Sequence, residues 1–182
     1  MPQGQPLTHR PEEERGLFER FWVAIFGSSQ ESDDLPRSST LYWRNARISL
    51  RSPEQISATV DRWHCYLHPR ARRVFALEQI EAILAIIARS VNADEDPIAP
   101  GSEDCVLWHG DLSVNEQSQL QAAICVVNKD RSKTIGFANR LLTFLFADDE
   151  SYDIVRALPP TQDALPMACG NQLCVCLAHV AL

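Results

Sequence analysis

Hydrophobic residues recur every three or four positions in the first half of the chain, which is the spacing of one face of an α-helix. This pattern predicts an amphipathic helix over 11–27. A second helix is predicted over 53–67, because Ser52 with the proline after it forms a helix start and Pro69 interrupts the helical pattern. A third helix is predicted over 70–91, where a broad apolar stripe continues.

The pattern changes after an acidic segment that contains proline and glycine, residues 93–104, and this segment is the predicted domain boundary. Short apolar runs at 105–108 and 120–128 predict strands, the second being rich in β-branched residues. The run 135–146 has helical length and an apolar face, and the acidic residues 148–150 are expected to end it. Helices followed by a mixed region predict an α+β fold.

The predicted organisation has a flexible, Pro/Gln/Gly-rich tail at its start and two structured parts. Its parts are the tail 1–10, a helical region 11–92 with a polar linker at 28–40, the acidic linker 93–104, and a small mixed α/β domain 105–182.

Composition places the chain among globular proteins: 182 residues, 45% hydrophobic and 23% charged. No apolar run reaches the roughly 18 residues that a membrane helix needs, so no membrane association is expected. The first residues lack the basic and apolar regions of a secretory signal. An intracellular location, nuclear or cytoplasmic, is therefore expected.

Arginine is concentrated in one segment although the net charge is −7. Residues 37–73 hold eight arginines and two acids. Basic clusters drive much of nucleic-acid binding, so this segment is the first candidate for a DNA contact. The alternative is a solvated helical surface. The candidate nucleic-acid-binding residues are Arg44, Arg47, Arg70, Arg72 and Arg73.

Six cysteines are present, and in a reducing compartment they are not expected to form structural disulfides. Cys169, Cys174 and His179 follow one another with four residues in each gap, and closely spaced Cys and His can supply three ligands of a tetrahedral zinc site. Cys105, at the start of the predicted second domain, is the leading candidate for the fourth ligand. Cys176 is an alternative ligand, since it also lies within reach in the sequence.

Residues 105–182 resemble the zinc-binding loop region of His-Cys box homing endonucleases, which belong to the His-Me finger (ββα-metal) nucleases. The resemblance rests on an early cysteine followed, after more than 60 residues, by Cys-x4-Cys-x4-His, together with the Cys-Val-Leu-Trp-His-Gly and Ala-Asn-Arg-Leu-Leu stretches. It implies a structural Zn²⁺ held by Cys105, Cys169, Cys174 and His179. It also implies a possible homodimer, because active members dimerise.

The same resemblance implies that catalysis is lost. Met167 stands where the family has its catalytic histidine, and a thioether cannot act as a general base. The family's magnesium-binding asparagine would follow His179 by about nine residues, and the sequence has three residues there. In the Ala-Asn-Arg-Leu-Leu stretch, Asn139 stands before the arginine, at a position where family members often have a histidine. No catalytic residue is therefore expected.

Two other histidine arrangements offer weaker candidates. His109 with Asp111 could form a base–orienter or metal pair in an active metal-dependent nuclease, and His64 with His68 could share a metal. An exposed loop histidine or ordinary helix residues are the favoured interpretations.

Three functional hypotheses follow, and they differ in what the protein binds or acts on. The first is a zinc-binding, endonuclease-like module without cleavage that binds nucleic acid. The second is a protein-interaction module with a structural zinc, whose 11–27 helix presents aromatic anchors to a protein partner. Those anchors are Phe18, Phe21, Trp22 and Phe26. The third, an active metal-dependent endonuclease, is least favoured.

Overall fold

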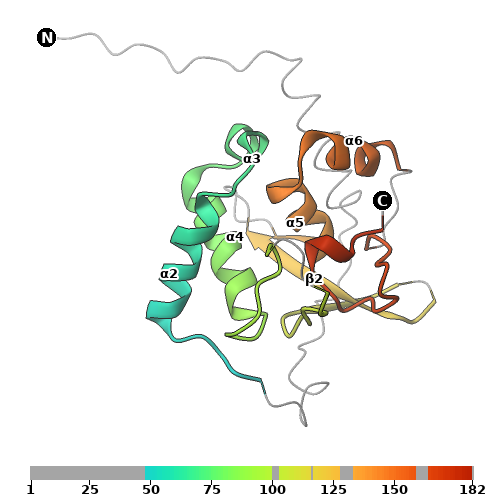
Figure 1. The fold of residues 1–182 in the computed structure, drawn as a ribbon, viewed down its shortest axis with the longest axis horizontal. Helices are drawn as coiled ribbons and strands as arrows, with labels where there is room; N and C mark the ends of the chain where they lie inside the picture. The colour runs from blue at the N-terminus through green and yellow to red at the C-terminus, as the bar shows by residue number, and fades with distance from the viewer. Residues whose placement is uncertain (1–47, 100–102, 116, 128–132, 159–163, 182) are drawn as a thin grey trace, which may run out of the picture.

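The computed structural model describes five stretches of the chain, namely 48–99, 103–115, 117–127, 133–158 and 164–181. The predicted tail, aromatic helix and polar linker lie outside these residues. The described part combines helices with a small antiparallel sheet, which confirms the predicted α+β class (Figure 1). None of its helices has the length and apolar character needed to cross a bilayer.

The first described helix, α2 (Pro53–His64), begins as the sequence predicts. The Ser52 hydroxyl accepts a hydrogen bond from the Gln55 backbone N–H, and the Gln55 side chain accepts one from the Ser52 N–H at 2.8 Å. Together these bonds satisfy two backbone donors that a helix start leaves open. The helix is shorter than predicted, ending at His64 rather than continuing to position 67.

The prediction of one long helix over 70–91 is wrong, because two helices occupy it: α3 (Pro69–Val74) and α4 (Leu77–Arg89). Phe75 between them takes an extended conformation, with φ −100° and ψ 145°. Its ring is buried and packs edge-on against Phe144, with the ring centroids 5.9 Å apart. Burial of this ring against a distant part of the chain accompanies the break, and periodicity alone cannot reveal such a contact.

The sheet has the order β1-β2-β3, with both pairs antiparallel. Its strands are β1 (Leu112–Val114), β2 (Leu120–Val127) and β3 (Lys133–Phe137). The predicted strand at 120–128 is confirmed as β2, whereas β1 was not expected. The predicted strand at 105–108 is reduced to a single bridge between Leu107 and Cys174.

The apolar run 135–146 is also divided: its first three residues end β3, and the helix α5 (Ala138–Phe146) follows directly. The acidic run after it starts another helix, α6 (Asp149–Ala157). The Asp148 carboxylate accepts a hydrogen bond from the Ser151 N–H at 2.8 Å, as a helix N-cap does. The acidic residues therefore mark a helix start that the sequence interpretation missed.

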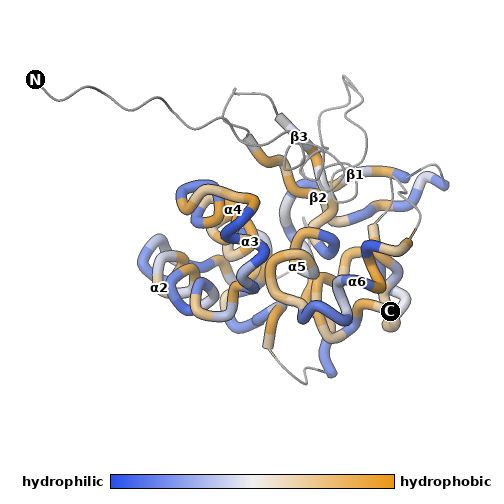
Figure 2. Tube along the Cα trace, turned by 90° about the horizontal axis from the view of Figure 1, so that it is seen from above, coloured by the Kyte–Doolittle hydropathy of each residue, from blue (hydrophilic) through white to orange (hydrophobic). Residues whose placement is uncertain are grey.

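One hydrophobic cluster joins the helices, the sheet and the C-terminal segment. Helix α5 packs on β2 and β3 and also contacts α3 and α6. In Figure 2 it is a mostly hydrophobic helix between those two neighbours. The cluster includes Trp63 before the predicted acidic linker and Trp108 and Cys176 after it. The acidic segment therefore connects two parts that share a core.

Candidate metal centre

Four side chains predicted as metal ligands lie together in the structure. Ligand atoms of Cys105, Cys169, Cys174 and His179 are all within 4.8 Å of one another. The His179 Nδ1 atom is 3.5 Å from the Cys174 Sγ and 3.8 Å from the Cys105 Sγ. In a tetrahedral zinc site with ordinary bond lengths, sulfur and nitrogen ligands lie about 3.6 Å apart. The cluster could therefore hold a metal ion with little rearrangement.

Cys105 and Cys174 approach because two distant segments pair side by side. The Val175 N–H donates to the Val106 carbonyl at 2.8 Å, and the Trp108 N–H donates to the Leu173 carbonyl at 2.9 Å. These bonds surround the bridge between Leu107 and Cys174. Buried Trp108, Val106 and Val175 anchor both segments in the core, so the two sulfurs are held on a rigid base.

A tight turn places Cys169 opposite Cys174. The Gly170 N–H donates to the Met167 carbonyl at 2.8 Å, and Gly170 has φ +72°, a conformation that residues with a Cβ rarely adopt. The backbone N–H of Asn171 donates to the Cys169 sulfur. The turn was not recognised in the sequence, although Gly followed by Asn is a common turn signal.

His179 ends the short 3₁₀ helix η2 (Leu177–His179). Its N–H donates to the Cys176 carbonyl at 3.0 Å, and its carbonyl accepts from the Ala168 N–H at 2.7 Å. The second bond lies beside a bridge between Met167 and Val180, so the end of the described chain folds back over the Cys169 turn. The imidazole is thereby held next to the thiols.

The three thiols differ in exposure and in pKa. Burial raises the pKa of Cys174 to about 12, although the Cys176 N–H, which donates to its sulfur, opposes this rise. Burial also raises the pKa of Cys105. At the exposed Cys169, burial acts to raise the pKa, but hydrogen bonds from the Asn171 N–H and from neighbouring thiols outweigh it and leave the pKa lowered. A metal ion would have to displace protons from Cys105 and Cys174.

Cys176 does not belong to the four-residue group. Its side chain is fully buried in the hydrophobic cluster. Its backbone instead supports two ligands, since its N–H donates to the Cys174 sulfur and its carbonyl accepts from the His179 N–H. The structure therefore places Cys174 rather than Cys176 in the cluster, a point that spacing alone left open.

The candidate nucleic-acid-binding arginines have different positions. Arg44 and Arg47 lie outside the described residues. Arg70 is buried, and its guanidinium donates to backbone carbonyls and to Asp149. Arg72 and Arg73 are exposed on α3, and Arg72 reaches the His64 carbonyl at 3.3 Å. Nucleic-acid binding stays a prediction, and Arg70 is occupied within the protein.

The other histidines have positions apart from the metal cluster. His68 caps α3: its Nδ1 accepts from the Arg70 N–H at 3.4 Å, and its Nε2 lies 3.5 Å from the Asp149 carboxylate. His109 is half-buried, and burial lowers its pKa while Glu95 opposes this. The Asp111 carbonyl accepts from the Trp108 indole at 2.8 Å. None of these residues joins the metal-ligand group found in the described chain.

Met167 is a buried residue two positions before Cys169 of the cluster. Its sulfur lies 3.4 Å from the Asn139 amide nitrogen. Asn139 also donates to the Leu165 carbonyl at 2.9 Å and accepts from the Leu165 N–H at 3.2 Å. Met167 and Asn139 are thus in contact, and together they fasten the segment before Cys169 to the start of α5.

Sequence and structure together define a Cys₃His cluster that joins a segment after the acidic linker to the end of the described chain. Three thiols and an imidazole are ligands suited to a tetrahedral divalent metal. No protein-family model, curated protein or solved structure matches this chain. Its functional assignment therefore rests on the chemistry of the cluster itself.

Proposed function

We propose that this chain is a zinc-binding protein in which one structural Zn²⁺ is held by the thiolates of three cysteines and the imidazole of His179. The observation that carries the proposal is the approach of all four ligand atoms to within 4.8 Å, from segments more than 60 residues apart. Three sulfur ligands favour zinc over hard cations such as magnesium or calcium. Four protein ligands leave no coordination position for a reacting water, as in structural zinc sites.

The proposed zinc stabilises the fold by joining two segments that contain little regular secondary structure. The residues at 105–108 form a single bridge rather than a strand, and the segment 164–181 has one short 3₁₀ helix. A metal that binds only the folded state adds its binding free energy to folding. At free zinc about 1,000 times the Kd, this would amount to about 4 kcal/mol.

The proposal extends to an endonuclease-like module without hydrolysis. Support comes from Met167, which lies at the position of the expected general base and packs its sulfur against Asn139. A thioether accepts no proton at neutral pH, so the residue cannot activate water. Magnesium-dependent nicking of plasmid DNA by the purified protein, retained in Met167→Ala, would contradict the absence of hydrolysis.

The zinc proposal is tested by metal analysis of the purified protein. We expect one zinc per chain by mass spectrometry, and loss of that zinc in Cys174→Ser, because this change removes the most buried ligand. A lower thermal midpoint should accompany the loss, and a chelator should lower the midpoint of the wild-type protein to a similar value.

Cys65→Ser is the matched control, since Cys65 is exposed and lies outside the ligand group. It should retain both the zinc and the wild-type midpoint. A wild-type protein that contains no zinc, takes up none after reduction, and melts unchanged in chelator would overturn the proposal.

A further inference from the structure

The loop between Cys169 and Cys174 controls the distance between two of the four candidate ligands. Only four residues separate the cysteines, and the chain must turn sharply for both sulfurs to face the same point. Cys174 is anchored in the core, whereas Cys169 is exposed. The position of the Cys169 sulfur therefore depends on contacts within the loop.

Asn171 makes three of these contacts. Its backbone N–H donates to the Cys169 sulfur. Its backbone carbonyl accepts from the Cys174 N–H at 3.0 Å. Its side-chain oxygen accepts from the Leu173 N–H at 3.0 Å. One residue thus contacts both cysteines through its backbone, and its side chain closes the turn between them.

The side-chain contact holds the turn in the form that permits the two backbone contacts. An asparagine oxygen that bonds the N–H two residues on forms an Asx turn, which restrains the local backbone. Gly170, directly before it, has φ +72° and needs such a restraint because glycine has many accessible conformations. Asn171 is exposed, so its contribution to the site comes from this geometry and not from core packing.

We infer that Asn171 is a positioning residue for the metal centre and that its side-chain amide sets the affinity of the site for zinc. This inference rests on the proposed zinc-binding function. Groups that orient metal ligands, without touching the ion, commonly change metal affinity by 10–100-fold when replaced. Asn171 orients the exposed ligand relative to the buried one, so its loss should separate the two sulfurs and weaken binding.

The test compares Asn171→Ala with Asn171→Asp, which retains an oxygen able to accept from the Leu173 N–H. Gln172→Ala, a change at the next residue of the same loop, is the control. Zinc affinity is measured by competition with a chromophoric chelator, and ligand geometry by the visible absorption of the Co²⁺-substituted protein. Thermal melts of the metal-free proteins show whether any effect is merely structural.

We expect about tenfold weaker zinc binding and an altered Co²⁺ spectrum in Asn171→Ala, with an unchanged metal-free melt. Asn171→Asp should recover the wild-type spectrum, and Gln172→Ala should match wild type throughout. Equal affinity and an identical spectrum in Asn171→Ala would overturn the inference while leaving the zinc proposal intact. A wild-type protein that binds no zinc would instead remove the proposed function itself.

Discussion

Cys174 and Cys176 lie two residues apart, and both side chains are fully buried. Spacing predicts that either could bind a metal beside His179, so the sequence could not choose between them. Which cysteine joins the cluster depends on backbone hydrogen bonds. The Cys176 N–H donates to the Cys174 sulfur and the Cys176 carbonyl accepts from the His179 N–H, while the Cys176 side chain lies in the core. Such contacts depend on how the chain folds back on itself, which residue spacing does not encode.

His109 gives a prediction about pH. Burial lowers the pKa of its imidazole below the ordinary value of 6.5, with Glu95 opposing the shift. A histidine with a depressed pKa in the folded state takes up its proton more readily when unfolded. Its full contribution to stability is therefore present above about pH 6.5 and is lost as the pH falls from there toward the folded pKa.

We expect metal-free His109→Gln protein to lose less unfolding free energy than metal-free wild type between pH 7.5 and pH 5. Urea denaturation at both pH values measures the difference. Every other ionisable group is present in both proteins, so the difference between the two losses reports on His109. Equal losses of unfolding free energy in the two proteins would show that folding does not lower the pKa of His109.

At the scale of helices and strands, local signals predicted the start of α2 but not the points at which two later apolar runs are divided. Ser52 and Gln55 form the capping box that their spacing indicates. The break at Phe75 and the division of 135–146 at Phe137 and Ala138 carry no proline or polar cluster. Both follow from tertiary packing, since Phe75 meets Phe144 and the end of β3 pairs with Ala123. Hydrophobic periodicity could not distinguish a buried strand that runs directly into a buried helix from one continuous buried helix.

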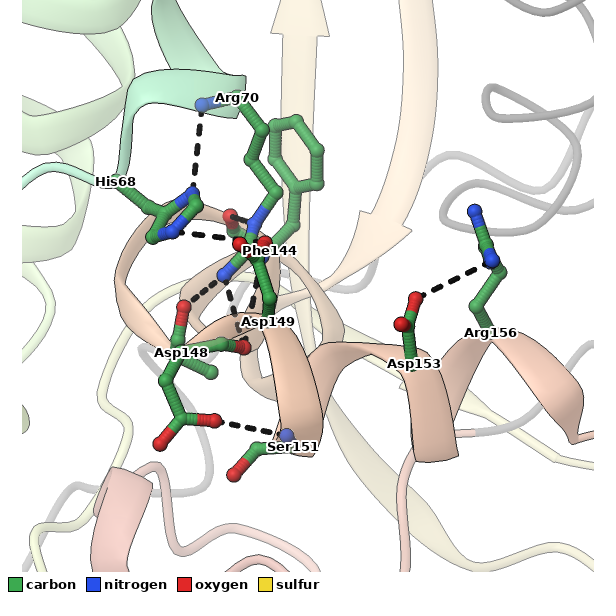
Figure 3. A network of polar contacts seen from close by, with 9 residues as sticks. His68, Arg70, Phe144, Asp148, Asp149, Ser151, Asp153 and Arg156 are labelled. Carbon is green, nitrogen blue, oxygen red and sulfur yellow. Dashed lines mark hydrogen bonds and ion pairs between the residues drawn. The ribbon is translucent and has the colours of Figure 1, made fainter.

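Arg70 joins three helices through a network of polar contacts at the end of α5 (Figure 3). Its guanidinium donates to the Phe144 carbonyl at 2.8 Å, to the Ala147 carbonyl, and to the Asp149 carboxylate at 2.9 Å. It also lies over the Tyr152 ring, 4.4 Å from the centroid. These bonds satisfy carbonyls that the end of a helix leaves open. The partners lie more than 70 positions away, so a basic cluster at 70–73 gave no sign of this role.

We expect Arg70→Met to destabilise the protein by about 2–4 kcal/mol, because several buried carbonyls at the end of α5 lose their donor. Denaturant unfolding followed by circular dichroism measures this change. Arg73→Met, on the exposed side of the same helix, should change stability by less than about 0.5 kcal/mol. Similar small effects in both variants would mean that the Arg70 network contributes little.

At the scale of the whole molecule, the acidic segment 93–104 connects parts that share one core. Asp96 accepts from the Trp63 indole at 3.1 Å and pairs with Arg62 at 2.8 Å. The Arg51 side chain donates to the Glu95 carbonyl at 2.5 Å. Composition predicted the change from helices to sheet correctly, and with it the α+β class. It could not show that the acidic residues serve as hydrogen-bond acceptors for the helical part.

The Pro97 carbonyl extends this connection to the metal centre, since it accepts from the Leu177 N–H at 2.8 Å. Leu177 begins the short helix that ends at His179. The helical region, the acidic segment and the candidate metal ligands are therefore linked by a continuous set of contacts. Spacing predicted Cys169, Cys174 and His179 as candidate ligands, with Cys105 as the leading candidate for the fourth, whereas this support depends on residues whose types are common in any loop.

The wide separation of the ligands also sets an order of events during synthesis. A ribosome releases Cys105 first, and Cys169 follows 64 residues later. At about 5–20 residues per second, that delay lasts roughly 3–13 s. The strands and helices between them emerge within this interval, while the nascent chain carries a single ligand thiol of the cluster. Binding of the proposed zinc is therefore expected only after the sheet and α5 have left the ribosome, as a late step that joins segments already folded.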